Sequence, residues 1–267
     1  MDVISEYKST ELVYNHVIHK NPSKGSFSEE AHNFYELIYI VSGDVSYTIE
    51  DRIYKLKKGD LIITEPAKYH FVRIDSEKDY ERYDVFFDIR TLPIKDLPPL
   101  PKERDVLGLY GNTVVSDIFS KLDFYYGKLR SEDFAKIIQI SVSELFFVLS
   151  ISDNGAHDVS YLRVSPLVSD ALKMIGDNLF TLGSVSDLAK ELFVTESYLY
   201  RCFKKEMHST PKKYISSKRL LAAQNMISMG EMATKVSEKC GFGDYTSFYR
   251  SYVEFFGYPP SKEKVFK

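Results

Sequence analysis

Polar side chains that can bind nucleic acid recur at matched positions in the C-terminal part of the chain. The matched pairs are Ser197 with Thr246, Tyr200 with Tyr249 and Arg201 with Arg250. Each pair is separated by 49 residues. Hydroxyl and guanidinium groups on the first turns of a helix can reach DNA bases and phosphates. The spacing therefore predicts two DNA-reading helices of the same kind.

The segments that must position these side chains indicate two helix-turn-helix units. In the first unit we expect Ser186 to cap one helix, and Thr195 to cap a second helix over residues 196–205. In the second unit Asp244 is the expected cap of the second helix. Capping side chains accept hydrogen bonds from the first backbone amides of a helix, so these residues mark where each helix begins.

Small residues lie where the two helices of each unit must cross. Ala189 in the first unit and Ser237 in the second leave room for the close contact that a short turn requires. One helical hairpin alone is more often an ordinary structural element than a DNA-binding unit. Two copies with matching caps, small residues and arginines favour DNA binding. The residues expected to contact DNA are Thr195, Ser197, Tyr200, Arg201, Lys204, Lys205, Asp244, Tyr245, Thr246, Tyr249 and Arg250.

A single amphipathic helix is predicted between the two units, from Thr210 to about Met229. About 18 residues at 1.5 Å each span about 27 Å. Successive major grooves on one side of DNA lie about 34 Å apart. We therefore expect the two reading helices to enter adjacent grooves from one chain.

Residues 166–261 resemble the AraC/XylS family of transcription activators. The residues that carry the resemblance are Ala189, Leu199, Arg201, Phe203-Lys204-Lys205, Pro211, Tyr214, Gly241-Phe242, Asp244, Phe248, Arg250, Phe256-Gly257 and Pro260-Ser261. Three positions depart from the family pattern. Phe193 replaces a turn glycine, Ala233 replaces a larger aliphatic residue, and Val253-Glu254 replaces a basic pair. The last departure removes phosphate contacts, so we expect the second unit to bind DNA more weakly.

The N-terminal part is predicted to be a β-sandwich or barrel followed by helices. Strand candidates cover residues 37–41, 45–49, 61–64, 71–74 and 83–87, and they are short and regularly spaced. The period changes to a helical one from about Thr113. We expect a two-domain α+β protein, with a barrel domain over 1–150, a linker over 151–164 and an all-α DNA-binding domain over 165–267.

The barrel sequence resembles a degenerate pair of cupin motifs, as in the sensor domains of AraC-type regulators. The resemblance places His32, Glu36 and His70 at the ligand-binding positions. His32, Phe34, Glu36, Ile38 and Ile40 are expected to share one strand face by period two. Three interpretations remain open: a pocket for a sugar or another small polar ligand, a metal site, and a structural His–Glu interaction. Glu30 stands where a metal-binding cupin has another histidine, so no cofactor is expected.

An apolar stripe on the second predicted helix of this domain suggests dimerisation. Phe134, Ile138, Leu145 and Leu149 recur at helical spacing. We expect that the end of the barrel leaves part of this stripe exposed, and large exposed apolar patches usually mark contacts. The prediction is a homodimer.

Charge is divided unequally along the chain, whose net charge is −3. Residues 1–164 hold 20 Lys and Arg against 27 Asp and Glu, whereas residues 165–267 hold 15 against 11. Only the second part therefore suits a polyanion. Cys202 and Cys240 cannot form a disulfide framework, and we interpret both as packing residues. We find no signal peptide and expect apolar stretches too short to span a membrane, which predicts a cytoplasmic protein.

Two functions of different classes follow from these patterns. The first is a ligand-responsive transcription regulator without catalysis, which binds promoter DNA and, if it is an activator, RNA polymerase. The alternative is a metal-dependent cupin enzyme fused to a DNA-binding domain, or a regulator whose N-terminal domain only dimerises. The sequence contains no Ser/His/Asp constellation, phosphate-binding glycine loop or CxxC pair.

Overall fold

The computed structural model describes residues 1–26, 31–101, 104–151 and 157–263, and it divides into two compact units. The first unit comprises Met1–Ser28, Phe34–Ile49 and Ile53–Leu162. The second comprises Arg163–Lys267 together with Glu29–Asn33 and Glu50–Arg52.

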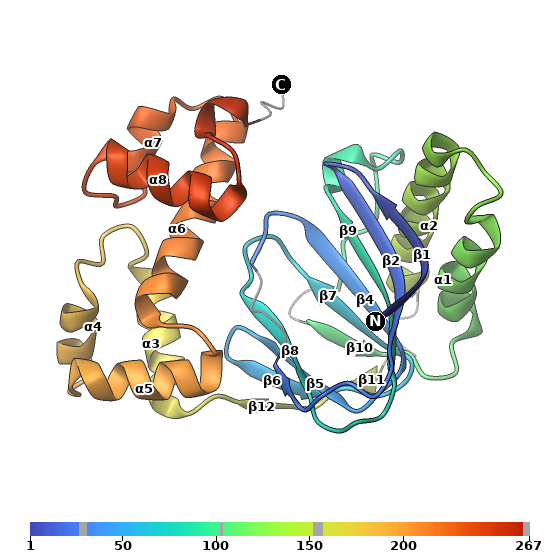
Figure 1. The fold of residues 1–267 in the computed structure, drawn as a ribbon, viewed down its shortest axis with the longest axis horizontal. Coiled ribbons are helices and arrows are strands. Elements are labelled where there is room, and N and C mark those ends of the chain that lie inside the picture. The colour runs from blue at the N-terminus through green and yellow to red at the C-terminus, as the bar shows by residue number, and fades with distance from the viewer. Residues whose placement is uncertain (27–30, 102–103, 152–156, 264–267) are drawn as a thin grey trace. The chain divides into compact units, whose positions relative to one another are not determined.

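Two antiparallel sheets build the first unit (Figure 1). Among the described residues, one sheet has the strand order β1-β2-β9-β4-β7-β10-β11 and the other has the order β12-β6-β5-β8-β3. The strands are β1 Asp2–Lys8, β2 Leu12–His19, β3 Gly25–Ser26, β4 Tyr35–Ser42, β5 Val45–Ile49, β6 Arg52–Lys55, β7 Asp60–Thr64, β8 His70–Ile74, β9 Tyr80–Phe87, β10 Val106–Gly108, β11 His157–Asp158 and β12 Tyr161–Arg163. The predicted barrel-like architecture is confirmed.

Alternation along the strands produces two separate cores. On β4, Leu37 and Tyr39 point to one face and pack in a cluster with the helices, whereas Ile38 and Ile40 point between the sheets and pack with residues of β5 and β8. Glu36 has the same parity as Ile38, so it lies on the inner face of the barrel. Because β4 has a core on each of its two faces, its central run is buried on both sides and is almost wholly apolar.

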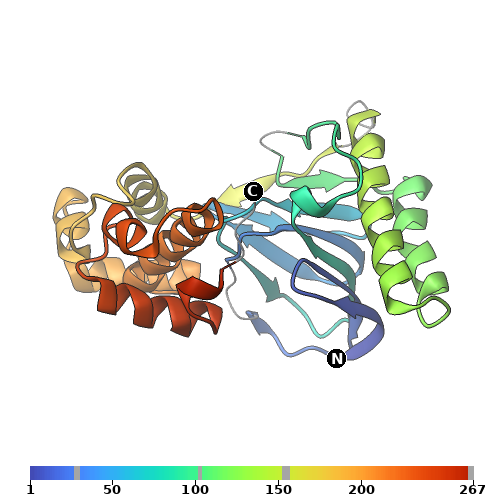
Figure 2. The same ribbon diagram turned by 90° about the horizontal axis from the view of Figure 1, so that it is seen from above.

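Helices α1, Thr113–Tyr125, and α2, Ser131–Ile151, cover the outer face of the larger sheet (Figure 2). Phe134, Ile138 and Leu145 are no more than 4% exposed and pack onto that sheet. The expectation that this stripe is partly exposed is therefore wrong. The outer sheet face is broad and apolar, so it buries the whole stripe.

Helix α2 also corrects the expectation that apolar stretches are too short to span a membrane. Within the described residues it is the one helix of sufficient length and hydropathy, with 21 residues and a mean hydropathy of 1.7 over its most apolar window. Core helices of soluble proteins meet the same criterion. The packing of Phe146 and Leu149 against the sheet assigns α2 to the core of the first unit.

The predicted linker over 151–164 is partly wrong. Residues 152–156 lie outside the described part of the chain. His157 and Asp158 pair with β10 as strand β11, and Tyr161–Arg163 forms β12. These residues join the sheets because an edge strand offers backbone N–H and C=O groups with which a short segment can form hydrogen bonds.

The second unit is helical, as expected. Its elements are α3 Pro166–Asp177, α4 Val185–Glu191, α5 Glu196–Met207, α6 Pro211–Ser228, α7 Ala233–Lys239, α8 Tyr245–Phe256 and the short 3-10 helix η2 Pro260–Lys262; the first unit has a similar turn, η1 Ile89–Thr91. Helix α6 connects the two helix-turn-helix pairs (Figure 1). Its inner side packs with Val236, Phe248 and Tyr252 in one cluster.

Candidate functional site

Helix α5 presents a polar face that follows from its cap and its buried side. The side chain of Thr195 accepts from the backbone N–H of Tyr198 and begins the helix where predicted. Leu199, Phe203 and Met207 are fully buried. Because residues one turn apart share a face, the opposite side is exposed. It carries Ser197, Arg201, Lys204 and Lys205.

Tyr198 belongs to this face but was missed by the sequence prediction. Its ring is 44% exposed, and the guanidinium carbon of Arg201 lies 5.1 Å from the ring centroid. A cation over an aromatic face is held in one orientation. Tyr200, by contrast, is half-buried. The sequence could have indicated Tyr198, because it lies on the first turn of the helix between Thr195 and Arg201, which were both predicted to contact DNA.

Helix α8 has fewer cations than α5. Tyr245, Thr246, Tyr249 and Arg250 are exposed, as predicted, and Arg250 is the one cationic residue of the helix. Its sequence resemblance to α5 therefore covers the hydrogen-bonding groups but not the lysines. Weaker attraction for phosphate follows from the lower charge.

Asp244 acts as a helix cap. Its carboxylate accepts from the backbone N–H of Ser247 at 2.8 Å and from the Ser247 hydroxyl at 2.7 Å. These hydrogen bonds hold the pKa of Asp244 below its ordinary value. Both oxygens of the carboxylate therefore bind Ser247. A negative charge would also repel DNA phosphate. We therefore interpret Asp244 as a structural cap and not as a DNA contact.

The cap of α4 differs from the prediction. Ser184, rather than Ser186, caps the helix, and it forms a capping box with Asp187. In the turn that follows, Phe193 has a φ of 56° and a side chain that is 96% exposed. A positive φ favours glycine, so the departure from the family pattern at this position costs backbone strain.

Arg219 on α6 joins the two helix-turn-helix pairs and was not singled out from the sequence. Its guanidinium donates to the carbonyls of Leu179 at 2.8 Å, Leu182 at 2.7 Å and Gly241 at 2.9 Å. The first two lie before α4, and the third lies in the turn before α8. A Cβ on Gly241 would lie 2.5 Å from the carbonyl oxygen of Phe180, so only glycine fits there.

The barrel interior holds a buried acid–base pair. His70 Nε2 lies 3.0 Å from a carboxylate oxygen of Glu36, and both side chains are no more than 4% exposed. The hydroxyl of Tyr47 donates to the same oxygen at 3.3 Å, and its ring stacks on His70. His70 Nδ1 lies 2.9 Å from the carbonyl oxygen of Lys68, to which it donates. The ligand atoms of all three predicted residues, His32, Glu36 and His70, lie within 4.8 Å of one another, so the structure brings the whole predicted group together.

His32 does not share the strand face of Glu36, which corrects the sequence interpretation. Strand β4 begins at Tyr35, and His32 precedes it in an irregular segment. Asn33 and Phe34 form a bend instead of continuing the strand, so the period-two argument does not reach residue 32.

A second polar group lies on the inner face of β9. Arg82 Nε donates to Asp84 at 2.9 Å, and the guanidinium carbon lies 4.9 Å from the ring centroid of Tyr80. Three buried polar atoms on the inner faces of β7 and β9 have no hydrogen-bond partner among the described residues. They are Arg82 Nη1, the Tyr80 hydroxyl and Thr64 Oγ1. Such atoms are costly without a partner, which indicates an occupant that accepts hydrogen bonds.

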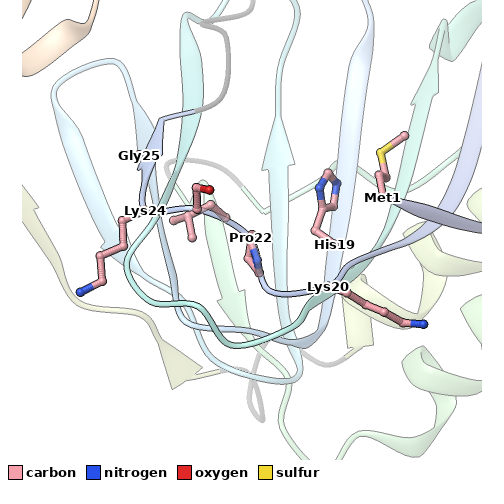
Figure 3. Close-up of a pocket in the computed structure, with 8 residues that line it drawn as sticks. Met1, His19, Lys20, Pro22, Lys24 and Gly25 are labelled. Atoms are coloured by element: carbon pink, nitrogen blue, oxygen red, sulfur yellow. The ribbon is translucent and has the colours of Figure 1, made fainter.

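A pocket of about 430 Å³ opens at one end of the barrel (Figure 3). It is lined by Met1, His19, Lys20, Pro22, Ser23, Lys24, Gly25 and Ile74. His19 stacks on Tyr80 with ring centroids 6.0 Å apart, which connects the pocket to the inner face of β9. Glu36 and His70 lie toward the other end, four residues from Ile40 and Ile74 along their strands.

The outer face of the same sheet carries a hydrogen-bond network around Asp123 of α1. Its carboxylate accepts from Tyr14 at 3.2 Å, from Tyr83 at 2.8 Å and from Ser5 at 2.5 Å, and it lies 2.9 Å from His16 Nδ1. The other ring nitrogen of His16 lies 2.9 Å from Glu81. The network fastens α1 to β1, β2 and β9.

Two family matches agree with this geometry. The family described as "AraC-like ligand binding domain" matches residues 16–92, which hold most of the barrel. The family described as "Helix-turn-helix domain" matches residues 188–264, which include α5, α6, α7 and α8. Together they account for both units.

The chain belongs to the AraC family of transcriptional regulators. It is 25% identical over 142 residues to the HTH-type transcriptional regulator GbdR of Pseudomonas aeruginosa, covering 51% of this chain and 39% of that protein. It is 29% identical over 90 residues to the lactose operon transcription activator of Staphylococcus xylosus, covering 33% and 32%. The chain thus spans less than half the length of these curated relatives. The solved structure of ToxT from Vibrio cholerae aligns over 95% of this chain and 97% of its own, at 14% identity and a TM-score of 0.38.

Proposed function

We propose that this AraC-family protein binds promoter DNA through α5 and α8 and regulates transcription in response to a small molecule in its barrel. The observation that carries the proposal is the pair of capped helices with matched exposed hydroxyls and arginines, placed at the two ends of α6. The positive balance of residues 165–267 supports contact with DNA. We place this activity in the cytoplasm, with RNA polymerase as a partner if the protein activates.

Arg201 is expected to read a base, whereas Lys204 is expected to contact phosphate. Removing a bidentate arginine–guanine contact costs about 1–3 kcal/mol and relaxes preference at one base pair. Removing a phosphate contact weakens binding to every sequence and reduces the salt slope by about one. Affinities of Arg201→Ala and Lys204→Ala for promoter and scrambled DNA, measured over a range of salt concentrations, distinguish these roles. An equal loss on both DNAs for Arg201→Ala contradicts base reading.

A small molecule is the proposed occupant of the barrel because of the unpartnered polar atoms on its inner face. Sugars are one candidate class, and the name of the Staphylococcus xylosus relative refers to lactose. We further propose that the chain has no enzymatic activity. Metal analysis of protein prepared without chelators tests this against the cupin-enzyme alternative, which requires stoichiometric iron, manganese or zinc.

We also propose a homodimer, formed through the outer side of α2 and not through the predicted stripe. Ile140, Phe147 and Ile151 are 51%, 43% and 80% exposed, and they recur at helical spacing with Glu144 between them. Lys121 of α1 pairs with Glu144 at the centre of this surface. Apolar residues around one charged pair suit a two-fold contact between identical helices.

Phe147→Asp is expected to dissociate this dimer without unfolding the first unit. Across a two-fold contact the introduced carboxylate would face the carboxylate of the second copy and repel it. In the monomer the side chain is exposed, so water solvates the charge. Thr10→Asp, in the exposed turn after β1, adds the same charge elsewhere. Sedimentation at micromolar concentration should show a monomer for Phe147→Asp and a dimer for Thr10→Asp and wild type. A wild-type monomer contradicts the proposal.

A further inference from the structure

We propose that the barrel binds a small organic anion, a carboxylate or phosphate, which enters through the pocket at His19 and binds Arg82 and Tyr80. This inference rests on the proposed function and names the chemical class of its effector. It moves the ligand-binding group from the Glu36–His70 pair to Arg82 and Tyr80 on β9.

The inner atoms favour an anion because they are hydrogen-bond donors. Tyr80 is 1% exposed, and its hydroxyl has no hydrogen-bond partner among the described residues. Arg82 uses Nε for Asp84, while Nη1 has no partner in the same part of the chain. A guanidinium nitrogen can only donate, so its partner must accept. Carboxylate and phosphate oxygens are the strongest acceptors available to a ligand.

The carboxylate of Asp84 beside Arg82 is compatible with a bound anion. It contacts Arg82 through Nε, and a guanidinium can bind a second acceptor through its other nitrogens. The stacking of Tyr80 between Arg82 and His19 places its hydroxyl within one continuous group of side chains. This group extends from the inner face of β9 to the wall of the pocket.

The rim of the pocket has the matching charge. Lys20 and Lys24 extend on either side of the pocket, and His19 lies between them in this view (Figure 3). Lys20 is paired with Asp2 at 2.9 Å, so Lys24 supplies the larger share of uncompensated charge at the rim. Cations at a pocket entrance raise the local concentration of an anion and its rate of entry.

The test is titration of the full-length protein with inorganic phosphate, with acetate and with uncharged glucose. Binding is followed by the imidazole NMR resonances of His19, assigned with His19→Gln, and by calorimetry. Phosphate or acetate should shift the His19 resonances, and glucose should not. A response to phosphate alone identifies a phosphorylated effector, and a response to acetate alone identifies a carboxylate.

Two variants locate the anion. Tyr80→Phe removes one hydroxyl and keeps the ring, so it should weaken binding about fivefold to tenfold. Arg82→Gln should weaken it more, and Tyr80→Phe keeps the test valid if Arg82→Gln fails to fold. Lys95→Ala removes an exposed lysine outside the pocket and should change nothing.

The proposal is overturned if neither anion binds at tens of millimolar, if glucose binds equally well, or if Tyr80→Phe binds anions as wild type does. Promoter binding by the same preparations is measured in parallel. Glucose binding with intact DNA binding would overturn the anion but leave the proposed regulator standing. Loss of promoter binding by wild-type protein would instead overturn the proposed function.

Discussion

Arg219→Met is expected to lower the melting temperature of the second unit by about 12–24 °C and to abolish promoter binding. Three partly buried carbonyls lose a charged donor at once, and each unpaired group costs about 1–3 kcal/mol. Because Arg219 is half-exposed and water can replace part of this loss, we expect about 3 kcal/mol in total. A unit of about 100 residues shifts by about 4–8 °C for each kcal/mol.

The reason for the coupled loss of DNA binding is geometric. Arg219 links the segment before α4 to the turn before α8, so it fixes the spacing of both reading helices. Differential scanning calorimetry and promoter titration measure the two effects together. Lys212→Met on the same helix removes an exposed lysine and serves as the matched control. If Arg219→Met melts and binds as Lys212→Met does, the bridging role is wrong.

Asp123→Ala is expected to destabilise the first unit by about 3 kcal/mol. The substitution removes the carboxylate that accepts from Ser5, Tyr14 and Tyr83, and it leaves Nδ1 of His16 unpaired. These groups are buried or half-buried, and an orphaned polar group costs about 1–3 kcal/mol. A melting transition of the first unit that matches wild type would show that the network contributes nothing.

The same network should make the first unit less stable as the pH rises through the raised pKa of His16. Burial lowers the pKa of His16, but the hydrogen bonds that His16 donates to Asp123 and Glu81 outweigh burial and raise the pKa above the ordinary value of 6.5. A raised pKa contributes stability that is complete below pH 6.5 and is lost as the pH rises through the folded value.

Asp123 contributes in the opposite direction at acid pH. Burial raises its pKa, but hydrogen bonds from His16, Ser5 and Tyr83 hold it below the ordinary value of 3.8. Its contribution is present above pH 3.8 and is lost as the pH falls through the folded value. Melting temperatures of wild type should therefore be highest between these limits, and His16→Gln should flatten the alkaline fall. An unchanged alkaline slope in His16→Gln contradicts the assignment.

The helices and their exposed faces could be predicted from the sequence because they depend on local signals. Thr195 and Asp244 cap the helices that they were expected to cap, since an N-cap acts within three residues. Ser184 and Ser186 both have suitable hydroxyls, and only the position of Asp187 decides between them. Local patterns of this kind gave the arrangement of the DNA-binding unit.

The side chains that connect distant segments could not be predicted in this way. Arg219 resembles any helical arginine until α6 is placed beside the carbonyls that it contacts. The inward side of Arg82 depends on the register of β9 with β2 and β4. His32 shows the converse error, because a period-two pattern was extended across a bend that the sequence does not reveal.

The most direct test of DNA binding by both helices is methylation protection of promoter guanines by the full-length wild-type protein. Base contacts by α5 and α8 should protect guanines in two successive major grooves, about 10 base pairs apart on one side of the helix. Arg201→Ala should expose guanines in one groove and Arg250→Ala those in the other. Protection confined to a single groove per chain, or unchanged by both substitutions, would contradict the central claim that two helices of one chain read DNA.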